Sequence, residues 1–153
     1  MTENKIRVVT TNKKARHDYH IIRSIEAGIA LKGTEVKSVR DGKVSLSESY
    51  ARFIKGELWI IGMHIAPYLK SAFVNHDPVR SRKLLLHRSE LKKLIRQVEE
   101  KGVTLIPLKV YFKRHLVKVE IGLARGKRQY DKRAAIAERD MKRDMERKTK
   151  IRY

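Results

Sequence analysis

The sequence predicts a mainly β protein: a small closed barrel with short helices and a basic C-terminal tail. Three observations lead to this prediction. Alternating apolar and polar residues mark five or six strands, turn residues join several of them as hairpins, and one amphipathic helix precedes the last pair of strands. A β-sandwich satisfies the same pattern and stays as the alternative.

The first long strand is predicted over residues 19–31. Its odd positions are apolar except Arg23, whereas even positions such as Glu26 are polar, so one face of the strand is exposed to water. Gly28 inside this pattern predicts a bulge or a sharp bend, as a closing barrel needs. A short helix is expected next, over residues 34–41.

Two hairpins follow from the strand and turn signals. One joins residues 50–54 to 57–61 through Lys55-Gly56, and the other joins residues 104–112 to 116–123 through residues 113–115. In the last strand, apolar odd positions from Val117 to Leu123 alternate with polar or small residues. This alternation is typical of a half-buried strand.

The second helix is predicted over residues 89–101, because its apolar residues recur at i, i+3, i+4 and i+7 and Gly102 can end it. Residues 75–83 are interpreted as a basic loop. A barrel similar to the oligonucleotide/oligosaccharide-binding (OB) fold accommodates this order of elements most simply, since such barrels bind oligonucleotides through one face and its loops.

We predict two parts: an OB-like RNA-binding barrel over residues 1–126 and a basic tail over residues 127–153. The tail holds 11 Lys/Arg against 5 Asp/Glu, and its few apolar residues form only a narrow helical stripe. Its favourable i, i+4 charge pairs contribute about 0.2–0.5 kcal/mol each, too little to stabilise an isolated helix. We therefore expect it to be disordered when free and helical when bound. A non-specific basic extension is the alternative.

The net charge of +20 is shared by both parts, since residues 1–126 hold 26 Lys/Arg against 12 Asp/Glu. This balance favours a nucleic acid as partner. An anionic membrane surface is less favoured, because no segment sets a broad apolar helical face against its lysines. The absence of cysteine excludes disulfides and thiolate metal sites and fits a cytoplasmic location. No signal peptide or membrane span is expected.

No catalytic constellation is evident, so we predict that the protein is not an enzyme. Gly42-Lys43 lacks the flanking residues of a phosphate-binding loop. His17 and His20, three apart on an expected strand, would point to opposite faces, and the carboxylates show no paired spacing. We expect no metal and no cofactor. An RNA-processing enzyme and a general nucleic-acid coating protein are the rival interpretations.

Clusters of basic residues interleaved with aromatics predict a shared anion-binding surface. The aromatics are few, and Phe53, Trp59 and Phe112 are assigned to the core, which favours a structured RNA read by its shape over a single strand read by stacking. The RNA-binding residues predicted from these clusters are Asn12, Lys13, Arg16, His17, Tyr19, Lys37, Arg40, Arg82 and Lys83.

Four segments along the chain carry a family resemblance: residues 12–19 (NKKARHDY), 26–38 (EAGIALKGTEVKS), 77–86 (DPVRSRKLLL) and 122–133 (GLARGKRQYDKR). In these segments and in their order, the chain resembles the SsrA-binding protein (SmpB) family, the partner of transfer-messenger RNA in bacterial trans-translation. Four long motifs in order, covering most of the chain from Asn12 onward, make the resemblance specific.

The resemblance implies an OB-type barrel that binds the tRNA-like domain of transfer-messenger RNA on the side formed by its D- and T-loops. It implies that the complex enters a stalled ribosome, where the tail occupies the vacant decoding centre of the small subunit and the messenger channel. It adds Glu26, Leu85 and Lys118 to the RNA-binding residues. We expect a cytoplasmic protein that is monomeric when free and has no enzymatic activity of its own.

The resemblance also implies which residues of the tail bind the ribosome: Gly126, Lys127, Arg128, Tyr130, Asp131, Lys132 and Arg133. Many relatives carry His where this chain has Tyr130. Stacking on a base survives this exchange, but a role for a charged imidazole does not.

Overall fold

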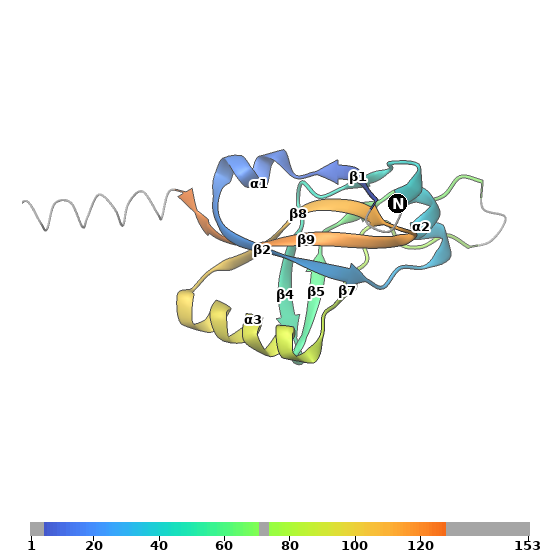
Figure 1. Ribbon diagram of the computed structural model, residues 1–153. Coiled ribbons are helices and arrows are strands. Elements are labelled where there is room, and N and C mark those ends of the chain that lie inside the picture. Colours follow the sequence, from blue (N-terminus) through green and yellow to red (C-terminus); the bar gives the residue numbers. More distant parts are fainter. Residues whose placement is uncertain (1–4, 71–73, 128–153) are drawn as a thin grey trace, which may run out of the picture.

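The computed structural model describes residues 5–70 and 74–127, and in these ranges it has nine strands and three helices (Figure 1). The elements in chain order are β1 (Ile6–Thr11), α1 (Lys13–Asp18), β2 (Tyr19–Ile29), α2 (Gly33–Arg40), β3 (Val44–Ser45), β4 (Tyr50–Ile54), β5 (Glu57–Ile61), β6 (His64–Ile65), β7 (Arg82–Leu85), α3 (Arg88–Lys101), β8 (Thr104–Lys113) and β9 (Leu116–Gly126).

The main sheet closes on itself. Its strand order is β1-β8-β4-β5-β7-β2-β9, and β9 pairs in addition with β8. The strands from β8 through β9 therefore form a ring, with β1 added to β8 outside it. This pairing agrees with the predicted barrel and not with two separate sheets packed face to face. A second small sheet contains β3 and β6.

Both predicted hairpins are confirmed. Lys55 (φ 50°) and Gly56 (φ 77°) turn the chain between β4 and β5, and Arg114 (φ 61°) turns it between β8 and β9. The fully buried residues of the core include Leu58, Ile60, Val110, Val119 and Ile121. Three of these five residues belong to β8 and β9, so this pair of strands supplies a large part of the core.

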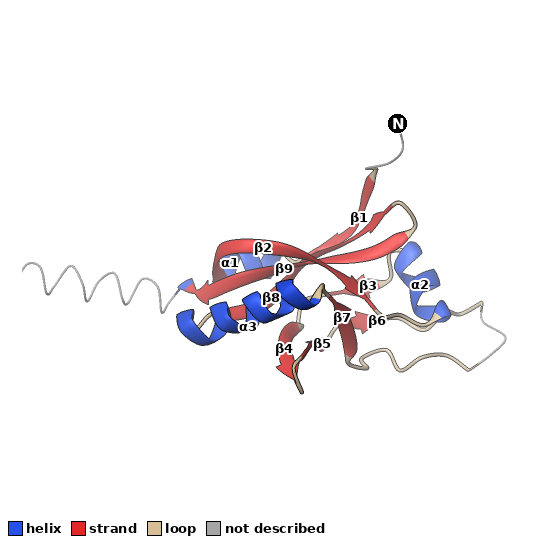
Figure 2. Ribbon diagram, turned by 60° about the horizontal axis from the view of Figure 1, so that its bottom comes forward, coloured by secondary structure: helices blue, strands red, loops and turns tan. Residues whose placement is uncertain are grey.

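The two predicted helices are also confirmed, as α2 and α3. Leu94 packs its side chain into the core, and Gly102 ends α3 in the left-handed conformation at φ 60°. The chain enters β2 from α1 and leaves it toward α2, so α1 and α2 lie at opposite ends of this long strand (Figure 1). Figure 2 shows α3 running along one side of the β2, β8 and β9 strands.

Several local predictions were incomplete or wrong. β1 and α1 were not predicted from the sequence, and residues 75–83 are not wholly a loop because β7 begins at Arg82. The bulge in β2 lies between Ile21 and Arg23 and not at Gly28, which pairs in register with both Leu85 and Lys118. Position 28 favours glycine because Leu85 of β7 lies close to it: an added Cβ would be 3.2 Å from the Cβ of Leu85.

Aromatic burial is mixed. Phe112 belongs to the buried core as predicted, whereas Phe53 and Trp59 are only half-buried. Within residues 5–70 and 74–127, no helix has the length and apolar character that a membrane span needs. The predicted behaviour of the tail concerns residues 127–153, of which residues 128–153 lie outside the described ranges.

Candidate nucleic-acid interface

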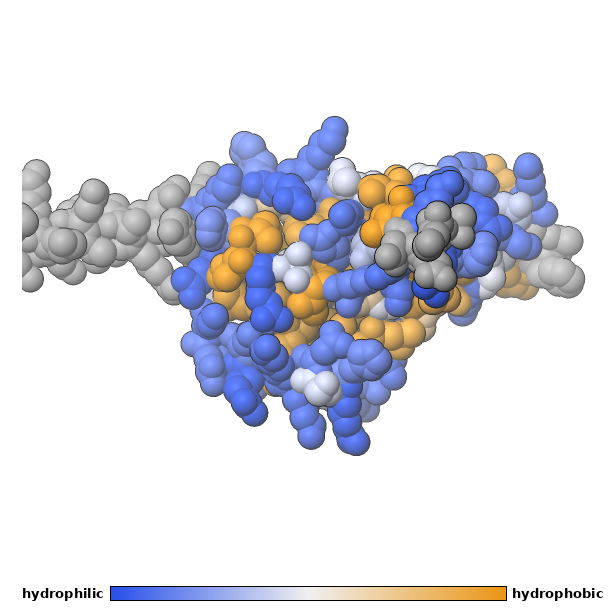
Figure 3. Space-filling view, in the orientation of Figure 1, coloured by the Kyte–Doolittle hydropathy of each residue, from blue (hydrophilic) through white to orange (hydrophobic). Residues whose placement is uncertain are grey.

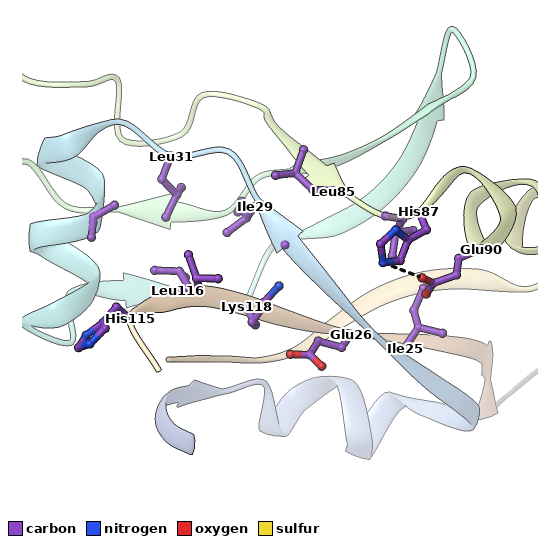
Figure 4. Close-up of a pocket in the computed structure, with 14 residues that line it drawn as sticks. Ile25, Glu26, Ile29, Leu31, Leu85, His87, Glu90, His115, Leu116 and Lys118 are labelled. Atoms are coloured by element: carbon purple, nitrogen blue, oxygen red, sulfur yellow. Dashed lines mark ion pairs between the residues drawn. The ribbon is translucent and has the colours of Figure 1, made fainter. Parts of the chain in front are cut away.

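A groove of about 760 Å³ lies between the end of β2, the start of α2, the β7–α3 junction and the turn into β9 (Figure 4). Apolar side chains make most of its wall, with a few charged groups and two histidines. The lining residues are Ile25, Glu26, Gly28, Ile29, Leu31, Val36, Leu85, Leu86, His87, Glu90, His115, Leu116, Val117 and Lys118.

The groove brings together Glu26, Leu85 and Lys118, which are far apart in the sequence. Near its end, β2 pairs with β7 on one side and with β9 on the other, so Gly28 lies opposite both Leu85 and Lys118. Glu26 is two residues earlier on β2 and therefore points to the same face as position 28. The three residues that the family resemblance implied thus share one surface.

Leu85 is exposed, although it belongs to an apolar run. Its exposed fraction is 49%, whereas the neighbouring Leu84 is 3% exposed and packs in the core. Figure 3 shows apolar residues gathered across the middle of the β2–β9 face, between hydrophilic margins. An apolar side chain left in a groove among charged groups is available for contact with a base or a sugar.

The charged groups of the groove differ in how they are paired. Lys113 Nζ lies 3.3 Å from Glu26 Oε2. Burial, together with the nearby Glu26 carboxylate, which accepts its hydrogen bond, raises the pKa of the Tyr111 phenol well above its usual range. Among the described residues, no carboxylate lies within 4.0 Å of the Lys118 amine. This amine is therefore free to bind a phosphate.

Two histidines of the groove were not predicted from the sequence. His87 Nε2 lies 3.9 Å from Glu90 Oε1, an ion pair when the ring is protonated, and His115 lies in the exposed turn before β9. His115 belongs to the residues of the predicted hairpin turn, so its nearness to Lys118 was accessible from the sequence. The position of His87 was not, because it depends on the pairing of β7 with β2.

Two residues predicted to bind RNA are buried and used inside the protein. Asn12 accepts a hydrogen bond from the Ala15 N–H at 3.1 Å, as the N-cap of α1, and donates to the carbonyls of Leu46 (3.3 Å) and Pro107 (3.0 Å). Arg82 has no exposed surface and is paired with Glu35. These side chains support the fold, and their assignment to an RNA-contacting surface is corrected.

The remaining predicted residues are divided between separate places. Lys13, Arg16 and His17 are exposed on α1, with Tyr19 half-buried beside them. Lys37, whose amine lies 5.4 Å from the centre of the Tyr68 ring, and Arg40 are exposed on α2 at the other end of β2. On β7, Lys83 forms an ion pair with Glu57 of β5, with 2.9 Å between Lys83 Nζ and Glu57 Oε1. The single shared surface expected from the sequence is therefore several surfaces.

The α1 end of the barrel is where the tail begins. A hollow of about 500 Å³ there is lined by His17, Asp18, Tyr19, Gly126 and Lys127. The other residues predicted to bind the ribosome, Arg128, Tyr130, Asp131, Lys132 and Arg133, lie outside the described residues. In the described part of the chain, no group of three or more His, Asp and Glu side chains is arranged to hold a metal ion.

Comparisons with known proteins give a consistent result. Residues 9–151 match the family model described as SmpB protein. The SsrA-binding protein of Acetivibrio thermocellus is 57% identical over 150 residues, which cover 98% of this chain and 97% of the relative. That of Persephonella marina is 56% identical over 145 residues, 95% of each chain. A chain from a solved structure described as "tmRNA-SmpB: a journey to the center of the bacterial ribosome" has 58% identity and a TM-score of 0.64, covering 77% of this chain and 83% of that one.

Proposed function

The chain belongs to the SmpB protein family, and from this membership we propose that it is an RNA-binding adaptor of trans-translation. It binds the tRNA-like domain of transfer-messenger RNA and delivers it to stalled ribosomes. The names of its relatives and the transfer-messenger RNA complex of its structural neighbour support this function.

The observation that carries the RNA-binding half of the proposal is the groove that joins Glu26, Leu85 and Lys118. The amine of Lys118 binds a backbone phosphate, and Leu85 packs against a sugar or a base edge. Glu26 accepts a hydrogen bond from a base amino group or a ribose 2′-hydroxyl. A wall that is mostly apolar, with few charges, suits recognition of a folded RNA surface better than the coating of any polyanion.

The ribosomal half of the proposal assigns residues 127–153 to the vacant decoding centre and messenger channel. The tail begins beside α1, at the start of β2, whereas α2 and the groove lie toward the other end of this strand. An elongated arrangement of this kind lets the barrel hold transfer-messenger RNA while the tail reaches a second RNA. Since it works with ribosomes, we place the protein in the cytoplasm.

We further propose that the protein has no catalytic role, and that the chemistry of tagging belongs to the ribosome and to the enzyme that charges the RNA. Incubation of the purified protein with transfer-messenger RNA, with and without divalent metal, tests this directly. Cleaved or modified RNA would favour the rival interpretation, an RNA-processing enzyme.

The decisive experiment is a titration of the full chain and of residues 1–126 against the tRNA-like domain, bulk tRNA and duplex DNA at two salt concentrations. We expect tight binding to the tRNA-like domain alone, undiminished by loss of the tail. Equal binding to all three nucleic acids, falling steeply with salt and with truncation, would leave only non-specific release of counterions and would refute a specific adaptor.

A further inference from the structure

Next to residues that line the groove, a buried carboxylate joins two arginines. Glu35 of α2 has no exposed surface. Its Oε1 accepts from Arg80 Nη2 at 2.5 Å, from Arg80 Nε at 3.1 Å and from the Lys32 N–H at 2.8 Å, and its Oε2 accepts from Arg82 Nε. Burial alone would raise the pKa of Glu35, but these hydrogen bonds hold the pKa below its ordinary value. The carboxylate is therefore charged inside the protein.

The remaining donors of the two arginines bind backbone carbonyls of the surrounding loops. Arg82 donates to Met63 at 2.6 Å and to Pro78 at 3.1 Å, and Arg80 donates to Ala30 at 3.3 Å. A buried ion pair offsets its loss of hydration only when its other donors are satisfied in this way. Both guanidinium groups donate their hydrogen bonds within the protein, so neither offers two free N–H donors to a phosphate.

This cluster ties together α2, β7 and the end of β2, which are among the elements that build the groove. Val36, which lines the groove, directly follows Glu35 on α2, and Leu85 stands three residues after Arg82 on β7. Ala30, held by Arg80, lies between Ile29 and Leu31, which also line the groove. The cluster of Glu35, Arg80 and Arg82, here called the clamp, thus connects α2, β7 and the end of β2.

We propose that Glu35, Arg80 and Arg82 are positioning residues for RNA recognition: the clamp fixes the spacing of the groove walls without touching the RNA. The inference rests on the proposed function of the groove. A recognition site needs its contacting side chains held to about 0.5 Å by supporting residues. The basic motif around Arg80 and Arg82 therefore acts on RNA binding through Glu35 and not through phosphate contacts.

The variant Glu35→Gln distinguishes positioning from electrostatic attraction, because the two explanations predict opposite changes in RNA affinity. This change makes the protein more positive by one charge, so attraction alone predicts RNA binding as tight as that of the wild type, or tighter. Positioning predicts a loss of affinity of about tenfold for the tRNA-like domain. The matched control is Glu57→Gln on β5, which changes the net charge by the same amount. It removes a half-exposed carboxylate that pairs with Lys83 of β7, and we expect this variant to bind RNA like the wild type.

Arg80→Met is the second, milder variant, because a quarter of the Arg80 side chain is exposed. We expect weaker binding with an unchanged slope of log affinity against log salt concentration. A lost phosphate contact would reduce the magnitude of that slope by about 0.7–0.9. A reduced slope for Arg80→Met, or wild-type affinity for a folded Glu35→Gln protein, would overturn the proposal.

A measurement without RNA keeps this test separate from the proposed function. In methyl NMR spectra of the free Arg80→Met protein, the signals of Val36 and Leu85 should shift, whereas that of Leu108, in the cluster under α1, should stay in place. Unmoved groove methyls would contradict the clamp even if the wild type binds RNA. Failure of the wild type to bind the tRNA-like domain would instead refute the proposed function.

Discussion

Leu84 and Leu85 are neighbours on β7 with different tasks. Leu84 is 3% exposed and packs in the core, whereas Leu85 is 49% exposed and lines the groove. We expect Leu84→Ala to lower the free energy of unfolding by about 2–5 kcal/mol and to leave the affinity of the folded protein for RNA unchanged. Leu85→Ala should cost less than about 1 kcal/mol of stability and weaken binding. Urea denaturation and RNA titration of both variants measure the two effects, and matching stability losses would contradict the assignment of Leu85 to the groove.

Lys118 is the charged residue of the groove whose amine is free to bind phosphate. Lys118→Ala should reduce affinity for the tRNA-like domain about tenfold, equivalent to about 1.4 kcal/mol, and lower the magnitude of the salt slope by about 0.7–0.9. Lys92→Ala, on the exposed surface of α3, removes the same charge outside the groove and serves as the control. Equal losses in the two variants would mean that only net charge matters.

At the residue scale, the sequence did not show which polar residues are buried against distant partners. Arg82 occurs in a basic run, and its burial follows from Glu35, a residue 47 positions earlier. Asn12 precedes a basic segment and was grouped with it, yet its amide caps α1 and bridges to Leu46 and Pro107. Long-range hydrogen bonds of this kind leave no periodic signal.

Among the elements, the connection of α2 to β7 should make stability depend on pH. The pKa of Glu35 is lowered in the folded protein from an ordinary value of 4.5. Its contribution is therefore complete above pH 4.5 and is lost as the pH falls through the folded-state value. We expect the urea midpoint of the wild type to fall more steeply below pH 4.5 than that of Glu35→Gln.

At pH 7, where Glu35 is fully charged, the same substitution should lower the free energy of unfolding by about 3 kcal/mol, because it leaves the buried Arg82 and the partly buried Arg80 without a counter-charge. Domains of this size have about 5–15 kcal/mol, so the variant stays folded for comparison. Parallel pH profiles for the two proteins would show that Glu35 is not the group responsible.

The elements predicted from the sequence are those with strong local signals. The hairpins had alternating strands and turn residues such as Lys55-Gly56, and α3 had an apolar stripe ending at Gly102. In contrast, α1 buries only Ala15, so no helical period was visible. β7 has just four residues, and its identity depends on pairing with β2 and β5. Elements stabilised by tertiary contacts were missed for this reason.

For the molecule as a whole, the closed barrel was predictable in outline, and the groove was not. Ring closure through β8 and β9 makes neighbours of strands that are distant in the sequence, and it is this closure that assembles Glu26, Leu85 and Lys118. The residue pattern alone predicted one shared surface for all the basic clusters. The family resemblance pointed to the three groove residues, because members of a family share a fold in which the same positions lie together.

The separation of groove and tail leads to a prediction about concentration. A groove variant such as Lys118→Ala weakens formation of the RNA complex, so about tenfold more transfer-messenger RNA should restore tagging activity by mass action. Lys132→Ala combined with Arg133→Ala should bind the RNA normally and lose tagging, and no excess of RNA should restore it, because the defect arises after the complex has formed. A tagging assay over a range of RNA concentrations compares the two. Rescue of the tail variant by RNA, or weakened binding of that variant to the isolated RNA, would contradict this division between barrel and tail.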